Sequence, residues 1–144
     1  MSEIPATLTE RVHAFMDDMQ SRDTRRLARW MTDATVFWVP PREPLTGGRR
    51  ILALLRAIFG MYGEMQWTVR HIYELAPSRV VYFHESVGTL AKNGEPYTNQ
   101  IVTLIDFDAD GRIAYLSDYF KSTATFSQPE GGPPPIHPEP PARA

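Results

Sequence analysis

The spacing of hydrophobic residues along this 144-residue chain changes once, near Gln66. Before that point they recur at helical spacing, and after it they alternate with polar residues. Thr7 and Glu10 form a capping box at the start of the first segment. Apolar residues then follow three or four positions apart: Val12, Phe15, Met16 and Met19. The pattern predicts a first helix over about residues 7–20.

Two further helices and one extended segment are predicted before the change of period. RDTRRLARWM predicts a short second helix. ATVFWVP predicts an extended segment that ends at Pro40 and Pro41, which lack the N–H that a strand ladder needs. In RRILALLRAIFGMY the apolar residues form one broad stripe, so we expect a third helix that runs to about Gly60 or Tyr62.

Four segments rich in Val, Ile, Tyr, Phe and Thr follow and predict strands. Their expected bounds are 66–75, 79–90, 97–108 and 112–121. Turn signals separate them at Pro77-Ser78, Asn93-Gly94 and Asp110-Gly111, and the last two are typical of tight antiparallel hairpins. Helices followed by consecutive strands predict an α+β fold, with three N-terminal helices packed on a curved antiparallel sheet.

The chain is expected to form one folded domain over residues 1–126 and a Pro-rich tail over residues 127–144. The tail holds 7 of the 13 prolines and few residues that could pack in a core. We therefore expect the tail to be disordered or extended.

Composition and charge exclude several classes of function. The net charge is -2 and the basic residues are scattered, so we expect no nucleic-acid partner. The lack of cysteine excludes disulfides and thiolate metal sites, and no histidine spacing is of metal-binding type, so we expect no metal site. Without a secretion signal or a long apolar run, the protein is expected to be cytoplasmic and to need no membrane.

The last predicted strand carries a carboxylate, Asp118, on the same face as Leu116 and Phe120. If the Asn93-Gly94 and Asp110-Gly111 turns are both two-residue loops, His84 faces Thr103 and Thr103 faces Asp118. These three side chains then form one row across neighbouring strands. A three-residue loop with a bulge at the second turn would shift its pairing by one and break the row.

Each polar residue on this face has a functional and a structural interpretation. Asp118 is either a general acid or base with a raised pKa, or a structural acid bound to backbone or Arg. His84 either orients Asp118 or takes a second proton, or is a structural histidine. Asn99 and Thr103 are candidates to bind a substrate oxygen. The apolar lining candidates favour a flat, largely apolar small molecule as ligand: Trp38, Met61, Tyr82, Ile101, Leu116 and Phe120.

The opposite face of the predicted sheet is too apolar to be left in water. It carries Phe83, Val87, Val102, Leu104, Tyr115 and Tyr119. We therefore expect a homodimer that forms through this face.

Three segments, DATVFWVPP, GGRRILALL and DFDADGRIAYLSDYF, resemble the NTF2-like superfamily in their order and spacing. The resemblance covers about residues 7–125. This superfamily includes the SnoaL-like polyketide cyclases, the ketosteroid isomerases and the limonene-epoxide hydrolases. The resemblance implies a cone-shaped α+β barrel, open at one end, with an apolar pocket between helices and sheet and usually a homodimeric assembly.

The resemblance also bears on the reaction. The ketosteroid isomerases carry their general base where this chain has Trp38, and their oxyanion-binding groups near Ala14 and Thr103, so all three groups are missing. Of the five groups that the epoxide hydrolases use, only an acid matching Asp118 is present. The SnoaL-like cyclases are more similar, because their acid-base carboxylate is also expected on a late strand of the meander.

The sequence therefore favours a cofactor-independent SnoaL-like enzyme that performs acid-base chemistry of the cyclase or isomerase type. Its substrate is expected to be small and largely apolar, either carbonyl-bearing or polycyclic, with Asp118 and His84 as catalytic residues. Two alternatives stay open. One is a non-catalytic small-molecule-binding or dimerisation module, and the other is an epoxide hydrolase.

Overall fold

A computed structural model describes residues 3–40 and 42–122 of the chain. Its helices are α1 (Leu8–Ser21), α2 (Thr24–Leu27), the 3-10 helix η1 (Ala28–Trp30) and α3 (Gly48–Phe59). Its strands are β1 (Val36–Trp38), β2 (Leu45–Thr46), β3 (Tyr62–Ala76), β4 (Arg79–Leu90), β5 (Pro96–Phe107) and β6 (Ile113–Phe120). The predicted tail over residues 127–144 lies outside the described residues.

The first helix lies within one residue of its predicted bounds at each end. Thr7 Oγ1 accepts a 3.2 Å hydrogen bond from the Glu10 backbone N–H, as in the first half of a capping box. At the other end Arg22 adopts a left-handed conformation, with φ of 55°, and its N–H bonds to the Met19 carbonyl. The helix buries its apolar stripe, including Val12 and Phe15, against the sheet.

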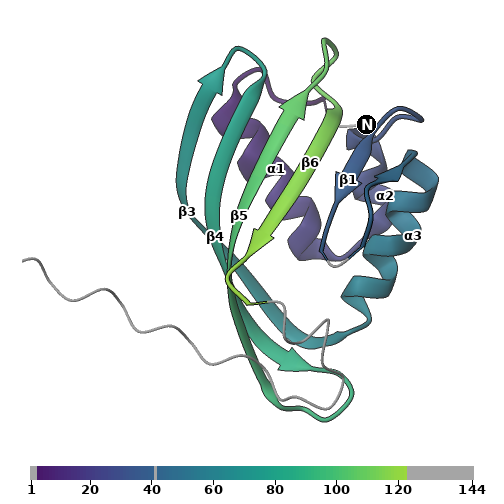
Figure 1. Cartoon of the computed structure of the whole chain (residues 1–144), viewed down its shortest axis with the longest axis vertical. Helices are drawn as coiled ribbons and strands as arrows, with labels where there is room; N and C mark the ends of the chain where they lie inside the picture. Colours follow the sequence, from purple (N-terminus) through teal and green to yellow (C-terminus); the bar gives the residue numbers. More distant parts are fainter. Residues whose placement is uncertain (1–2, 41, 123–144) are drawn as a thin grey trace, which may run out of the picture.

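The predicted strands form a meander, and Figure 1 shows β3 to β6 side by side across α1. The sheet order among the described residues is β2-β1-β6-β5-β4-β3. The α+β fold of helices on a curved sheet is confirmed, but the expectation of a wholly antiparallel sheet is wrong. Strand β1 runs parallel to β6, with Val36 opposite Tyr115. A side-chain bond from Thr35 Oγ1 to the Ile113 carbonyl, 2.7 Å long, fixes β1 in this place.

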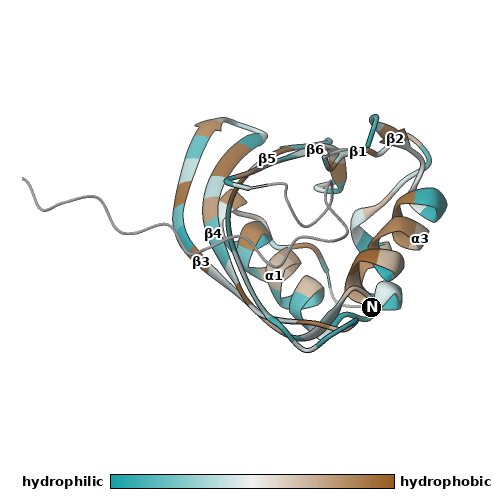
Figure 2. Ribbon diagram, turned by 60° about the horizontal axis from the view of Figure 1, so that its bottom comes forward, coloured by the Kyte–Doolittle hydropathy of each residue, from teal (hydrophilic) through white to brown (hydrophobic). Residues whose placement is uncertain are grey.

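The helices α1 and α3 cover the concave side of the sheet, as Figure 2 shows. They bury apolar residues of both helices against β4, β5 and β6, among them Phe15, Leu55, Tyr82, Ile105 and Leu116. Along β3 and β4, hydrophobic and hydrophilic residues alternate in Figure 2. This alternation is the two-residue period that the sequence shows after Gln66.

Strand β3 begins earlier than predicted, at Tyr62, and a bulge changes its register between Tyr62 and Met65. The bulge brings the β3 backbone close to Gly88 on β4. A Cβ atom on Gly88 would lie 2.8 Å from Met65 Cα, so only glycine fits there. Gln20 of α1 holds the same stretch, since its amide donates to the Met65 carbonyl at 2.7 Å and accepts from Trp67 N at 2.9 Å.

The hairpin between β4 and β5 differs from the prediction by two residues. Leu90, rather than Lys92, faces Glu95 across the turn, and its N–H donates to the Glu95 carbonyl at 2.9 Å. Gly94 takes a left-handed φ of 71° and bonds back to Leu90, so the loop contains four residues, 91–94. Asn93 Oδ1 supports the loop by accepting from Glu95 N.

The two-residue shift changes the pairs but keeps the faces, because side chains alternate with a period of two. His84 therefore pairs with Ile101 rather than with Thr103, and Thr103 pairs with Tyr82. In the same way, Ser86 pairs with Asn99 and Gly88 pairs with Tyr97. The predicted direct His84–Thr103 pair is wrong, and the two residues are diagonal neighbours on one face.

The hairpin between β5 and β6 has the predicted pairing, although its turn is longer than two residues. Asp108 N donates to the Arg112 carbonyl at 2.8 Å, which leaves three residues in the loop. A bulge between Asp106 and Phe107 then shifts the register back. Thr103 consequently pairs with Asp118, as predicted.

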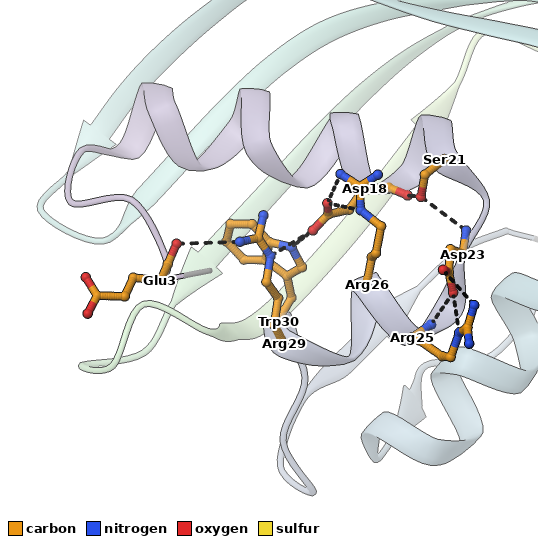
Figure 3. Close-up of polar contacts among 8 residues, drawn as sticks. All are labelled: Glu3, Asp18, Ser21, Asp23, Arg25, Arg26, Arg29 and Trp30. Carbon is orange, nitrogen blue, oxygen red and sulfur yellow. Dashed lines mark hydrogen bonds and ion pairs between the residues drawn. The ribbon is translucent and has the colours of Figure 1, made fainter. Parts of the chain in front are cut away.

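A buried acid ties α1 to the segment that follows it (Figure 3). Asp18 is 1% exposed, and its carboxylate accepts from Trp30 Nε1 at 2.8 Å and from Arg29 Nε at 2.8 Å. Arg26 contacts its other oxygen at 2.9 Å. The three donors satisfy the buried charge, so this cluster stabilises the packing of α1 on α2 and η1.

The convex face of the sheet keeps apolar side chains in solvent. Phe83, Val102 and Tyr119 form a row across β4, β5 and β6 on this face. Phe83 is 42% exposed and Tyr119 is 58% exposed. No helix within the described ranges is long and apolar enough to span a membrane.

Candidate functional site

A small cavity lies between the helices and the concave face of the sheet, with a volume of about 60 Å³. Its walls are mostly apolar, and they come from α1, α3 and the strands β1, β3, β4, β5 and β6. The lining includes Phe15, Met19, Phe37, Leu55, Ile58, Tyr62, Trp67, Tyr82, Tyr97, Ile101, Leu116 and Phe120. Four polar residues also line it: His84, Ser86, Thr103 and Asp118.

Three of these polar residues form a continuous hydrogen-bonded chain across β4, β5 and β6. Thr103 Oγ1 donates to Asp118 Oδ1 at 2.6 Å. His84 Nε2 lies 2.9 Å from the same Thr103 hydroxyl. Thr103 is 1% exposed and His84 is 7% exposed, so water has little access to the chain. The structure therefore brings together the three residues that the sequence predicts in one row.

The cavity environment shifts both titrating groups toward their neutral forms. Asp118 is only partly exposed, and burial raises its pKa from 3.8 to about 6. The hydrogen bond from Thr103 acts in the opposite direction with a smaller effect. Burial lowers the pKa of His84 from 6.5 to about 4. At neutral pH the pair is therefore a carboxylate and a neutral imidazole.

These protonation states fix the direction of the hydrogen bonds. An ionised Asp118 can only accept, so the Thr103 hydroxyl gives its proton to Asp118 and must accept from His84. His84 is then protonated on Nε2, and its Nδ1 is the unprotonated nitrogen. Among the described residues Nδ1 has no hydrogen-bond partner.

The hydrogen bonds among His84, Thr103 and Asp118 occupy only one oxygen of the Asp118 carboxylate. In the part of the chain that the structure describes, no hydrogen bond or ion pair engages Oδ2. A carboxylate with one held oxygen and one available oxygen, in an apolar cavity with a pKa near 6, is suited to exchange a proton near neutral pH. Residues 3–40 and 42–122 contain no group of three or more acids and histidines that could hold a metal ion.

The remaining predicted site residues divide into two groups. Tyr82, Ile101, Leu116 and Phe120 line the cavity together with the polar chain. Trp38 is 44% exposed and Met61 is half-buried, and neither belongs to the cavity lining. Asn99 lies on the concave face, but its amide is bonded to the backbone of Ser122 and to the Tyr97 hydroxyl.

Two tyrosines of the cavity, Tyr62 and Tyr97, are missing from the sequence prediction. Tyr97 has the same strand parity as Ile101 and Thr103, so the alternation in β5 could have placed it on this face. Tyr62 lies beyond the bulge in β3, and no sequence pattern shows that bulge. The two rings pack together with their centroids 5.1 Å apart.

Comparisons with known proteins agree with this architecture. A family model described as a SnoaL-like domain matches residues 12–116. A search among curated proteins found no relative of this chain.

Solved structures share the fold at low sequence identity. An LEH-like epoxide hydrolase of M. tuberculosis is 23% identical, with a TM-score of 0.65, and the match covers 81% of this chain and 84% of that one. A proposed SnoaL-like polyketide cyclase from Jannaschia sp. CCS1 is 16% identical, with a TM-score of 0.74 and coverage of 88% and 94%. A proposed polyketide cyclase from Pseudomonas putida KT2440 is 16% identical, with a TM-score of 0.73 and coverage of 86% and 98%. At these identities the likeness is one of fold.

Proposed function

Because the chain belongs to the SnoaL-like domain family, we propose that it is a cofactor-independent acid-base enzyme in which Asp118 exchanges a proton with a small carbonyl compound. The observation that carries this proposal is the Asp118 carboxylate, held at Oδ1 by Thr103 inside an apolar cavity. Burial places the pKa of this carboxyl at about 6. A base whose pKa lies near the working pH combines a large ionised fraction with useful basicity.

The proposed reaction begins when Asp118 Oδ2 takes a proton from the carbon next to the substrate carbonyl. The electron pair of the broken C–H bond moves into the carbonyl group and gives an enolate. Return of the proton from Asp118 to another carbon completes an isomerisation. In a cyclisation, the enolate carbon instead attacks a second carbonyl of the same molecule and forms the new C–C bond, and the resulting alkoxide takes the proton back from Asp118.

His84 is assigned a positioning role in this mechanism. Its lowered pKa, about 4, keeps it neutral, and its Nε2 is engaged with Thr103. By donating to the Thr103 hydroxyl, His84 keeps this hydroxyl as the donor to Asp118 Oδ1. Oδ2 of the carboxylate then stays outside the hydrogen bonds among the three residues.

The cavity size favours one of the two expected substrate types. Pockets for drug-sized ligands typically enclose about 300–1,000 Å³. The cavity here encloses about 60 Å³, which favours a molecule with few heavy atoms over a polycyclic substrate. The proposed substrate is therefore a compact carbonyl compound.

Epoxide hydrolysis is a second candidate, favoured by the structural likeness to the M. tuberculosis LEH-like epoxide hydrolase. In that reaction Asp118 would take a proton from water while the water oxygen attacks one epoxide carbon. The C–O bond of that carbon breaks, and the alkoxide formed takes the proton back from Asp118. A non-catalytic binding module is the third candidate, because it needs only the cavity and its walls.

The assembly is proposed to be a homodimer that forms through the convex face of the sheet. This face carries a groove of about 430 Å³, whose walls include Phe83, Val102 and Tyr119. Its rim carries charges of both signs, with Arg70 paired to Glu85 at 3.0 Å and Lys121 nearby. A second copy related by a two-fold axis can place opposite charges against each other and cover the apolar row.

Proton exchange into a small ketone tests the proposed reaction. We expect the protein to speed the exchange of deuterium from D₂O into cyclopentanone, followed by proton NMR. Asp118→Asn should lower this rate by about 100- to 10,000-fold. Asp110→Asn, in an exposed loop, is the matched control and should not change it.

The outcomes separate the three candidates. Exchange that depends on Asp118 and rises with pH through about 6 supports the proposed enzyme. Conversion of cyclopentene oxide to its diol, without ketone exchange, assigns the site to epoxide hydrolysis. Binding of cyclopentanone with neither reaction leaves a binding module.

A further inference from the structure

Two polar residues of the cavity wall on β4 carry hydrogen-bonding atoms that the acid-base mechanism above does not use. His84 is 7% exposed and Ser86 is 2% exposed, and both line the same cavity as Asp118. His84 contacts Thr103 through Nε2, and in the described part of the chain its Nδ1 has no partner. The side-chain hydroxyl of Ser86 likewise makes no hydrogen bond to another described residue.

The residues around the imidazole of His84 offer no donor to Nδ1. Val69 on β3 and Ile101 on β5 are its cross-strand partners, and both side chains are apolar. The Tyr82 ring packs on the imidazole with the centroids 5.1 Å apart, but its hydroxyl is bonded to Met16 Sδ at 3.3 Å. Because a buried acceptor without a partner costs free energy, we expect a donor for Nδ1 from a molecule inside the cavity.

The two unused atoms define the kind of group that fits them. In the tautomer set by the contact with Thr103, Nδ1 is an unprotonated nitrogen and can only accept. The Ser86 hydroxyl can both donate and accept. A carbonyl oxygen carries no proton, so it cannot satisfy Nδ1. A hydroxyl group can satisfy both residues, because its O–H donates to Nδ1 while its oxygen accepts from Ser86.

The spacing of His84 and Ser86 suits one bridging hydroxyl. They lie two residues apart on β4, so their side chains share a face and start roughly 6.5–7 Å apart. Two hydrogen bonds of about 2.8 Å each, made through one oxygen atom, bridge most of this gap. Asp118 lies two strands away on β6, about 10 Å from β4 at the backbone. A molecule of few heavy atoms can therefore extend from this pair of residues to Asp118.

We propose that His84 Nδ1 and the Ser86 hydroxyl form a subsite for a hydroxyl group of the substrate. This inference rests on the proposed acid-base function and names its substrate class, a compact hydroxy-carbonyl compound. The substrate hydroxyl lies between His84 and Ser86, and the C–H next to the carbonyl faces Asp118 Oδ2. A simple ketone is a poorer ligand, because it leaves Nδ1 and Ser86 unpaired in a buried site.

Nitrogen NMR of the unmutated protein tests this inference with hydroxyacetone and butanone. The two compounds have the same number of heavy atoms, and butanone has a methyl group where hydroxyacetone has its hydroxyl. In protein labelled with ¹⁵N-histidine, hydroxyacetone should move the Nδ1 signal of His84 toward the shift of an N–H nitrogen, because the nitrogen then accepts a hydrogen bond. Butanone should not produce this shift. His13, exposed on α1, is the internal control and should not respond to either compound.

The relative affinity of the two compounds gives a second readout. Hydroxyacetone should bind roughly tenfold more tightly than butanone. Ser86→Ala and His84→Gln should each largely remove this preference. Alanine lacks the hydroxyl, and glutamine can reach Thr103 as Nε2 does but has no acceptor at the place of Nδ1. Ser78→Ala and His13→Gln, both at exposed positions, are the matched controls and should keep the preference.

The outcomes separate this inference from the proposed reaction. Exchange that depends on Asp118, without a shift specific to hydroxyacetone at Nδ1, would overturn the subsite and leave the general base. The shift without any exchange would overturn the general base and leave the subsite. An Nδ1 signal that is already at the hydrogen-bonded position and does not respond would indicate a bound water only, and would overturn the inference. So would equal affinity for both compounds, or an Nδ1 signal that stays unchanged at every hydroxyacetone concentration that the fold tolerates.

Discussion

Thr103 and Asp118 face each other on β5 and β6, and the Thr103 hydroxyl donates a 2.6 Å hydrogen bond to Asp118 Oδ1. The bond joins a buried polar residue to a carboxyl whose pKa lies near 6. Because the same hydroxyl also contacts His84, the ionisation of Asp118 and the direction of the hydrogen bonds of Thr103 and His84 are coupled. Predictions about pH and about Thr103 follow from this arrangement.

The first prediction concerns stability as a function of pH. The folded-state pKa of Asp118, about 6, lies above its unfolded value of 3.8. Its stabilising contribution to the free energy of unfolding is therefore fully present below pH 3.8 and is lost as pH rises through 6. Relative to Asp118→Asn, the unmutated protein should therefore become more stable between pH 7 and pH 4, by up to about 3 kcal/mol. Urea unfolding of both proteins at several pH values measures this difference.

The comparison with the Asn variant is needed because His84 acts in the opposite direction. Its folded-state pKa, about 4, lies below its ordinary 6.5, so its contribution is present above pH 6.5 and is lost as pH falls through 4. The unmutated protein and Asp118→Asn both keep His84, so its effect largely cancels when their free energies of unfolding are subtracted. A difference of the opposite sign would identify Asp118 as a structural acid that is stabilised in its charged form.

The second prediction is that Thr103→Val raises the pKa of Asp118 above about 6, because the Thr103 hydrogen bond lowers it. The carboxyl ¹³C chemical shift, followed in a pH titration, measures this pKa directly. Thr68→Val is the matched control, since Thr68 is a strand residue that pairs with Glu85 on the other face. An unchanged titration in Thr103→Val would show that the hydroxyl does not stabilise the carboxylate.

The third prediction is that Gly88→Ala destabilises the fold, because the new Cβ would lie 2.8 Å from Met65 Cα. Overpacking of this kind costs roughly 1–3 kcal/mol, and here the opposing atoms are backbone. Gly60→Ala is the control, since its nearest atom would be 3.5 Å away and its φ of -68° suits alanine. Thermal melts should show a clear loss for Gly88→Ala alone, and equal melting of both variants would contradict the prediction.

The fourth prediction is that Asp18→Ala destabilises more than Asp23→Ala. Asp18 is 1% exposed and satisfies Trp30, Arg29 and Arg26. Its loss leaves a buried indole N–H without its acceptor and removes the carboxylate that Arg29 and Arg26 contact, at a cost of about 2–3 kcal/mol. Asp23 caps the short helix α2 from a partly exposed position, so its loss should cost less than the loss of Asp18. Denaturant unfolding should rank the two variants in this order, and the reverse ranking would refute the structural role of Asp18.

The fifth prediction concerns the proposed dimer. Introducing charges in the apolar row, as in the double variant Phe83→Glu and Tyr119→Glu, should give a monomer by light scattering. The cavity lies on the other face, so the fold should stay intact by circular dichroism. Leu75→Glu is the control, because Leu75 is 59% exposed and lies outside the groove. A monomeric mass for the unmutated protein would refute the dimer.

The sequence alone was sufficient for the order of the main elements, although not for the two-residue strand β2, and for the faces of the strands. Hydrophobic period distinguishes helix from strand, and a period of two assigns each residue of a strand to one face. For this reason His84, Thr103 and Asp118 were placed on one face correctly, although the β4–β5 register was two residues off. A shift by two moves a side chain along the sheet and never through it.

Tertiary structure decided the features that depend on distances between segments. The bulge that brings Tyr62 into the cavity requires Gly88 on a neighbouring strand, and the exposure of Trp38 depends on how β1 joins β6. The small cavity volume depends on how closely α1 and α3 approach the sheet. Patterns along the chain record which face a residue occupies, whereas the pairing of distant backbones and the space left between side chains are set only when the whole chain packs.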